Sequence, residues 1–242
     1  MGSRVVLTTA EGSFVGLEQL LRDRDFDVAT HPLLAFREPA DWSQVDALLR
    51  GWDQVPIVAL TSPRSASALV DRANRLNIDL ASGPTLWAGG TATKATLGDQ
   101  LAVRTPSQIA MGRAGRALGQ AMIEAGVKDR VVFVCGEPHR DDLPDLLRAS
   151  GVTVEEVVCY RSVLATPEIA CDAVSGANIV VVGSPRVATL LAGVRPAAAV
   201  HLVAVGPTTG DAARKSGWVP AAVADEPSSQ CVADAVKSAI DE

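Results

Sequence analysis

Small polar residues recur in this sequence where an apolar run gives way to an amphipathic helical pattern. They are Thr61 and Ser62, Gly89–Gly90 with Thr93, Gly136, Ser184, and Gly206 with Thr208 and Thr209. Where a parallel strand ends and a helix begins, hydroxyls, unpaired backbone N–H groups and the positive end of the helix dipole gather, and together they suit carboxylates. The alternative for each residue alone is that the hydroxyl caps its own helix or the glycine serves its turn. Their recurrence in both halves of the chain favours a shared anion-binding surface.

Several common catalytic patterns are absent from the sequence. No GxGxxG, no phosphate-binding GxxxxGK run and no GxSxG elbow occurs, so dinucleotide, nucleoside triphosphate and α/β-hydrolase sites have no local support. His31, His139 and His201 lie far apart, and no metal site is predicted from them. The cysteines form no CxxC pair and are expected to be ordinary thiols: Cys135, Cys159, Cys171 and Cys231. Any chemistry would rest on hydroxyls, backbone amides and the reactivity of the substrate.

The elements that must position these residues come from an internal repeat. Arg4–Val6 and the helical pattern after it return as Arg130–Val132 with a similar pattern. Ile57–Arg64 returns as Ile179–Arg186, each a buried strand that runs into a Ser-Pro helix start. Two further matches pair Gly90 and Thr93 with Gly206 and Thr209, and Pro106–Gln108 with Pro227–Gln230. Ordered matches of this kind indicate a duplication.

Strands that alternate with helices predict parallel sheets covered by helices on both faces. We expect an α/β protein of two similar doubly wound lobes, each a three-layer αβα arrangement, joined by a two-stranded linker. The junction between the repeats is only a short turn, and proline-containing stretches fall inside the repeats instead. The predicted crossovers are therefore residues 36–39 and 161–167. One lobe is discontinuous, residues 1–35 and 168–242, the other is residues 40–160, and the matching strand ends face a cleft.

The composition is that of a globular α/β protein. Of 242 residues, 48% are hydrophobic and only 4% aromatic, which suits aliphatic parallel strands. No apolar run approaches the roughly 20 residues that span a bilayer, and the start lacks a signal-peptide pattern. We expect no membrane partner and a cytoplasmic location. The net charge of −6 disfavours a nucleic-acid partner, although local donors can still hold a small anion.

A series of short motifs along the chain also carries a family resemblance. In order, they are Val5–Thr8, His31–Leu34, Leu60–Pro63, Ala88–Thr93, Cys135–Gly136 with Arg140, Val158–Ser162, Val182–Pro185 and Ala204–Thr209. Their order, over essentially the full length, resembles the uroporphyrinogen-III synthase family. The resemblance implies two lobes joined by a two-stranded linker.

The resemblance also implies an activity. Members of the family close hydroxymethylbilane, a linear tetrapyrrole polycarboxylate, into a ring and invert its last pyrrole with loss of water, without a metal or organic cofactor. Departure of the terminal hydroxyl gives an azafulvene, which the substituted carbon of the last pyrrole attacks to form a spiro intermediate that fragments and recloses. The enzyme must fold the chain, hold its carboxylates and assist the leaving hydroxyl.

The site residues follow from the same resemblance. Tyr160, the only tyrosine, matches the family's tyrosine beside the second linker and is predicted to assist the leaving hydroxyl; without the resemblance it would be taken for a packing residue. The predicted substrate-binding residues are Thr61, Ser62, Gly90, Thr93, Gly136, Arg140, Ser184, Gly206, Thr208 and Thr209. We expect a monomer.

Two alternatives stay open at this point. Many family members carry an arginine after the first strand, where this chain has Thr9 and Ala10. That departure prompts the hypothesis of a catalytically inactive module that binds a tetrapyrrole or another polycarboxylate as a sensor. A hinged solute-binding protein is the third candidate, which the lack of a signal-peptide pattern disfavours.

Overall fold

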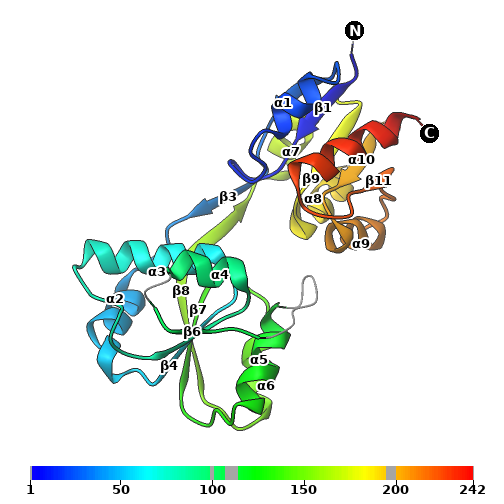
Figure 1. Cartoon of the computed structure of the whole chain (residues 1–242). Coiled ribbons are helices and arrows are strands. Elements are labelled where there is room, and N and C mark those ends of the chain that lie inside the picture. Colours follow the sequence, from blue (N-terminus) through cyan, green and yellow to red (C-terminus); the bar gives the residue numbers. More distant parts are fainter. Residues whose placement is uncertain (1, 99–100, 107–113, 195–199, 242) are drawn as a thin grey trace. The chain divides into compact units, whose positions relative to one another are not determined.

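The computed structural model describes residues 2–98, 101–106, 114–194 and 200–241 (Figure 1). The chain divides into two compact units: unit 1 is Met1–Phe36 with Val163–Glu242, and unit 2 is Arg37–Ser162. The chain passes between the units twice, within the neighbouring strands β3 (Leu34–Arg37) and β8 (Val154–Leu164). The predicted fold class, two α/β units of which one is discontinuous, is confirmed.

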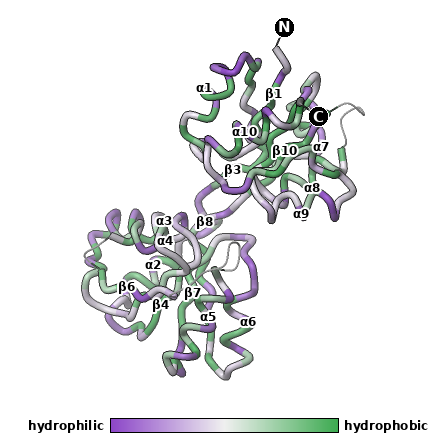
Figure 2. Tube along the Cα trace, turned by 45° about the vertical axis from the view of Figure 1, so that its right-hand side comes forward, coloured by the Kyte–Doolittle hydropathy of each residue, from purple (hydrophilic) through white to green (hydrophobic). Residues whose placement is uncertain are grey.

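Unit 1 contains a five-stranded parallel sheet in the order β11-β10-β9-β1-β2. Its strands are β1 (Arg4–Leu7), β2 (Asp27–Thr30), β9 (Ile179–Val182), β10 (His201–Ala204) and β11 (Ala222–Val223). All four residues of the central strand β9 are buried, because helices cover both faces of the sheet. Figure 2 shows hydrophobic residues gathered along these inner strands.

Among the described residues of unit 1, five helices cover the two faces of this sheet. A hydrophobic cluster on one face includes residues of α1 (Leu17–Arg22) and α10 (Ser229–Asp241). A cluster on the other face includes residues of α7 (Pro167–Ala173), α8 (Pro185–Val194) and α9 (Pro207–Lys215). Each of α7, α8 and α9 begins with proline, whose missing N–H is harmless at the first helical position. The unit therefore has the predicted three layers.

Unit 2 contains a six-stranded sheet in the order β3-β8-β7-β4-β5-β6. Besides β3 and β8, its strands are β4 (Ile57–Leu60), β5 (Thr85–Ala88), β6 (Val103–Arg104) and β7 (Val131–Glu137). The pairs from β8 through β6 are parallel. Their carboxyl ends consequently lie at one edge of the sheet, the edge where doubly wound proteins bind ligands.

Helices again cover both faces of the unit 2 sheet. One hydrophobic cluster includes residues of α2 (Ser43–Arg50), α3 (Pro63–Arg75) and α4 (Thr91–Leu97), with the short 3-10 helix η1 (Trp52–Gln54) beside them. The opposite cluster includes residues of α5 (Ala114–Glu124) and α6 (Asp142–Ala149). In the described part of the chain, no helix is long and apolar enough to cross a bilayer.

The duplication predicted from the sequence is visible in the topology. Strands β11-β10-β9-β1-β2 of unit 1 correspond, in the same order, to β6-β5-β4-β7-β8 of unit 2, and β3 is an addition at the edge of the second sheet. The helices α1, α8, α9 and α10 correspond to α6, α3, α4 and α5. Ser107 and Gln108 of the fourth sequence match lie outside the described residues.

Candidate active site

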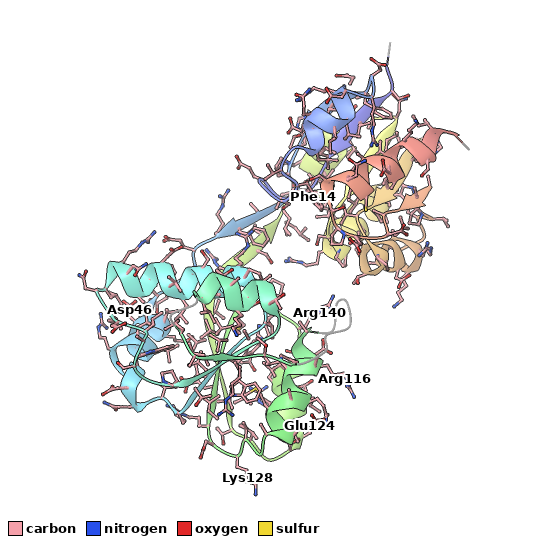
Figure 3. All side chains as sticks on the ribbon, in the orientation of Figure 1. Phe14, Asp46, Arg116, Glu124, Lys128 and Arg140 are labelled. Atoms are coloured by element: carbon pink, nitrogen blue, oxygen red, sulfur yellow. The ribbon has the colours of Figure 1, made fainter. Side chains whose placement is uncertain are left out.

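Five of the predicted site residues line one cavity at the carboxyl edge of the unit 2 sheet, near the labelled Arg140 in Figure 3. The cavity has a volume of about 340 Å³, and the five residues are Thr61, Ser62, Gly136, Arg140 and Tyr160. They come from different strands and their following segments: β4, β7 and β8 each contribute. The cavity is also lined by Ala114, Gly115, Cys135, Pro138, His139, Asp142 and Leu143.

An irregularity in the pairing of β7 with β8 determines where Tyr160 points. Cys135 pairs with Val158, whereas the next residue, Gly136, pairs with Tyr160, so Cys159 is an extra residue in β8. Such a bulge re-aims the side chains beside it. As a result, the consecutive residues Cys159 and Tyr160 both pack against the hydrophobic cluster under α2, α3 and α4.

The ring of Tyr160 lies directly over the backbone of Gly136. A Cβ atom at position 136 would be 2.2 Å from Cζ and 2.6 Å from the hydroxyl oxygen of Tyr160. No side chain fits there unless the ring moves. The structure therefore gives Gly136 a packing role beside Tyr160, in addition to its place in the cavity wall.

The surroundings of Tyr160 keep its hydroxyl protonated. Burial raises the pKa of Tyr160, while a hydrogen bond with the Ser62 hydroxyl and the positive charge of Arg64 oppose that rise. The free phenol already titrates near 10, far above neutral pH. A protonated hydroxyl at the wall of a cavity can donate a proton to a leaving group.

Ser62 has two partners, one structural and one in the cavity. Its extended backbone conformation places it as the N-cap of α3, and its Oγ accepts a hydrogen bond of 3.1 Å from the backbone N–H of Ser65. Pro63 follows at the first helical position. The helix-capping interpretation of Ser62 is thus confirmed, and the same hydroxyl also hydrogen-bonds Tyr160.

His139 is a cavity residue that the sequence analysis considered only as a metal ligand. Its Nδ1 lies 3.1 Å from the carbonyl oxygen of Gly136, and its Nε2 lies 2.9 Å from Oε2 of Glu156. Its ring packs edge-on against Phe133 at a centroid distance of 5.5 Å. Its position could have indicated a role in the site, because His139 follows the end of β7, as the residues predicted for the site follow or end their strands.

The two buried cysteines of the site are poor nucleophiles. Burial raises the pKa of Cys135 and of Cys159 to about 12, so both stay as thiols at neutral pH. Cys159 Sγ donates to the carbonyl oxygen of Cys135 across 3.3 Å. These contacts agree with the prediction of ordinary thiols; Cys171 is exposed and Cys231 partly exposed.

Gly90 and Thr93 lie at the next strand of the same edge. Gly90 is the N-cap residue of α4, with an extended backbone that any residue adopts, and Thr93 is only 3% exposed. Gly89 brings the end of β5 close to β4, because a Cβ atom there would lie 3.1 Å from Cα of Thr61. Neither Gly90 nor Thr93 lines the cavity around Tyr160.

The remaining predicted residues lie together at the carboxyl edge of the unit 1 sheet. Ser184 directly precedes α8, and Gly206 is the N-cap residue of α9. Thr208 is exposed in the first turn of α9, whereas Thr209 is 4% exposed. Because β9 and β10 are neighbours, these residues lie on adjacent strand ends.

The amino-acid sequence matches the model of one known protein family. Residues 16–232 match the family model described as uroporphyrinogen-III synthase HemD. The chain belongs to the uroporphyrinogen-III synthase family. Members of the uroporphyrinogen-III synthase family are cyclising lyases of haem biosynthesis, and membership implies a small-molecule tetrapyrrole substrate.

Solved structures of uroporphyrinogen III synthases share the fold. A mutant enzyme from the extremely thermophilic bacterium Thermus thermophilus matches with a TM-score of 0.71 and 17% identity over 99% of both chains. The enzyme from Helicobacter pylori matches with a TM-score of 0.63 and 16% identity over 98% of this chain and 99% of the other. No curated protein matches the chain.

Thr9, in the segment after β1 where the family resemblance led us to expect an arginine, is packed. Thr9 is 8% exposed, and a Cβ atom at Gly183 would lie 2.8 Å from its Cγ2. Thr8 beside it donates from Oγ1 to the carbonyl oxygen of Val181. The segment after β1 is therefore packed against the end of β9.

Proposed function

We propose that the cavity around Tyr160 is where the ring-closing reaction begins, with the Tyr160 hydroxyl as the proton donor to the leaving hydroxyl of hydroxymethylbilane. The observation that carries this proposal is a half-buried, protonated phenol in a cavity that it shares with Thr61, Ser62 and Arg140. A cavity wall of this kind offers a proton and hydrogen-bond donors without a strong nucleophile. That combination suits a substrate whose own pyrroles supply the electrons.

The proposed reaction conserves atoms and charge. The C–O bond of the terminal hydroxymethyl group breaks while Tyr160 transfers its proton to the departing oxygen, and water leaves. The resulting azafulvene-type cation is attacked by the substituted carbon of the last pyrrole, and the spiro intermediate fragments and recloses. Fragmentation breaks the bond between that carbon and the methylene group of the preceding pyrrole. This methylene carbon then bonds to the unsubstituted α carbon of the last pyrrole, which releases one proton. That proton restores Tyr160, so the net products are the cyclic tetrapyrrole and water.

We assign carboxylate binding in unit 2 to Thr61, Ser62 and Arg140, with the backbone N–H groups of the cavity wall. Charge-assisted hydrogen bonds from arginine to carboxylate are about twice as strong as neutral ones. Gly90 and Thr93, at the neighbouring strand end, remain predicted substrate-binding residues. Because Thr93 is buried, its predicted contribution is to the conformation of the first turn of α4.

We assign a second carboxylate-binding edge to unit 1, at Ser184, Gly206, Thr208 and Thr209. Its support is the duplication, since these residues occupy the positions that correspond to the unit 2 edge. Thr208 and Ser184 offer accessible hydroxyls, whereas the buried Thr209 serves by shaping the start of α9.

The decisive experiment supplies freshly made hydroxymethylbilane and separates the products by chromatography. The proposal expects the type III isomer; formation of the spontaneous type I isomer alone would refute it and would single out a non-catalytic binding protein. Tyr160→Phe keeps the ring and removes the proton, and kcat should fall by a factor of about 10 to 1000.

A matched control removes a hydroxyl elsewhere in the same unit. Thr96 Oγ1 donates to the carbonyl oxygen of Ala92 across 2.9 Å within α4, away from the cavity. Thr96→Val should leave kcat unchanged. If Tyr160→Phe behaves like Thr96→Val, Tyr160 is a packing residue and not the proton donor.

We further propose that the protein acts as a cytoplasmic monomer without a nucleic-acid partner. The net charge of −6 supports the absence of a phosphate-binding surface. Sedimentation with and without hydroxymethylbilane tests the oligomeric state, and a species heavier than one chain would contradict it.

A further inference from the structure

The position of the Tyr160 ring depends on a glycine that cannot be replaced without moving it. The ring and hydroxyl occupy the space into which any side chain at position 136 would project, with contacts of 2.2 to 2.6 Å. The atoms in the way belong to the ring itself, which packs against the cluster under α3 and hydrogen-bonds Ser62. The steric overlap of a side chain at position 136 could therefore be removed only if the Tyr160 ring moved.

A chain of polar contacts holds the carbonyl group of the same glycine. Arg148 of α6 contacts Oε1 of Glu156 at 2.6 Å, and Oε2 of Glu156 lies 2.9 Å from Nε2 of His139. His139 Nδ1 in turn lies 3.1 Å from the carbonyl oxygen of Gly136. A carbonyl oxygen only accepts, so the hydrogen bond requires a proton on Nδ1 of His139, and an attractive contact of Nε2 with the Glu156 carboxylate requires a second proton on Nε2. The His139 side chain is only 20% exposed, which shields the contact from water.

These contacts link both strands of the bulge. Glu156 and Tyr160 belong to β8, Gly136 to β7, and His139 to the loop that follows β7. The extra residue in β8 leaves the local ladder irregular between Cys135 and Gly136. The pairing resumes at Gly136 with Tyr160, and the contact of His139 with the Gly136 carbonyl adds a hydrogen bond to the backbone at the irregularity.

We propose that Gly136 and His139 are positioning residues for Tyr160: Gly136 leaves the space in which the ring lies, and His139 holds the Gly136 carbonyl so that this space is kept. The proposal rests on the proposed role of Tyr160 as proton donor. According to this proposal, the rate of proton transfer from Tyr160 depends on two residues that need not touch the reacting atoms.

The first test replaces Gly136 by alanine. Gly136→Ala should displace the ring by more than about 1 Å and lower kcat about a hundredfold, the loss typical of a misplaced catalytic group. Gly119→Ala is the matched control, because a Cβ atom there would lie 3.0 Å from the flexible end of Leu146, between α5 and α6. It should fold and keep its kcat.

The second test separates the two ring nitrogens of His139. His139→Asn can retain a donor near the position of Nδ1, His139→Gln retains a donor near that of Nε2, and His139→Ala retains neither. The proposal expects His139→Asn to keep most of the activity and the other two variants to lose about tenfold in kcat with KM little changed. If Gln preserves activity and Asn does not, the contact with Glu156 matters instead, and the proposal is wrong. If Gly136→Ala fails to fold, these three His139 variants still test the positioning role.

A spectroscopic readout distinguishes this inference from the proposed function. Tyr160 is the only tyrosine in the chain, so ultraviolet difference titration of tyrosinate reports on this one ring. Displacement should move its titration toward the ordinary value of about 10 in Gly136→Ala and His139→Ala, but not in His139→Asn. The charged or ionisable groups that act on Tyr160, namely Arg64, Cys135 and Cys159, are not substituted in any of these variants.

The outcomes of the two proposals are separate. Full activity of Tyr160→Phe would refute the proton donor, while the titrations would still show whether Gly136 and His139 position the ring. Unchanged titration and unchanged kcat in folded Gly136→Ala would overturn the positioning role.

Discussion

Replacing Ser62 separates helix capping from a role in the cavity. In Ser62→Ala, α3 loses the side chain that accepts from the N–H of Ser65, and loss of an N-cap of this type costs about 1 kcal/mol of stability. The hydroxyl of Ser65 keeps a partner, since it also donates to the carbonyl oxygen of Ser62 at 2.9 Å. Loss of the cap should therefore lower the free energy of unfolding by about 1 kcal/mol, and loss of the hydrogen bond with Tyr160 should add up to about 1 kcal/mol.

The same substitution removes the hydrogen bond between Ser62 and Tyr160. A hydrogen bond of this kind contributes about 1 kcal/mol, which corresponds to about fivefold in kcat/KM if it is needed in the transition state. Thr166→Ala is the control, because Thr166 caps α7 of unit 1 in the same way, accepting from the N–H of Ile169 and followed by proline. It should lose stability and keep full activity.

Ser62→Asp completes the comparison. Aspartate caps a helix as well as serine does and suits the positive end of the helix dipole, so the part of the stability that was lost with the cap should return. Activity should not return, since a carboxylate cannot donate to Tyr160 and repels the carboxylates of the substrate. The measurements are denaturant unfolding and the rate of type III product formation. If Ser62→Ala is as active as Thr166→Ala, Ser62 is only a helix cap and the reasoning fails.

Three further outcomes are expected. Arg140→Gln should raise KM about tenfold with kcat unchanged, because a charge-assisted hydrogen bond to a substrate carboxylate is lost; an equal fall in kcat would contradict simple binding. Iodoacetamide should label Cys171 and not Cys159 in the folded protein, since burial raises the pKa of Cys159 to about 12; mass spectrometry of the labelled peptides checks this. Hydrogen bonds from Arg72 lower the pKa of Asp46, so this pair stabilises the fold above the ordinary aspartate pKa of about 4 and the effect is lost as pH falls through the lowered value. Asp46→Asn should thus be less stable than the wild type at neutral pH, with a difference that shrinks in acid; denaturant unfolding at several pH values measures it.

Much of the fold could be predicted from the sequence because its signals are local. The alternation of short apolar runs with amphipathic helices predicts parallel sheets, and the Ser62-Pro63 and Ser184-Pro185 pairs mark helix starts that the structure places at α3 and α8. The repeat could be recognised from residue types alone, and the two sheets share the strand order that a duplication implies.

The candidate site was less predictable. The sequence predicted each site residue separately, and its pattern does not indicate which of them share one cavity. The cavity is lined by Thr61, Ser62, Gly136, Arg140 and Tyr160, but not by Gly90 or Thr93. The spacing of residues along the chain indicates which of them are neighbours within one helix or strand. A cavity, in contrast, is lined by residues from the ends of different strands.

By itself, the sequence determined the order of elements, the duplication and the single tyrosine beside the second crossover. Only the tertiary structure decided where the ring of that tyrosine lies. The bulge at Cys159 turns Tyr160 onto Gly136, and the contact of His139 with the Gly136 carbonyl joins residues from a strand and the loop after it. The physical reason is that register and bulges depend on pairing between strands, which leaves no trace in the local pattern of either strand.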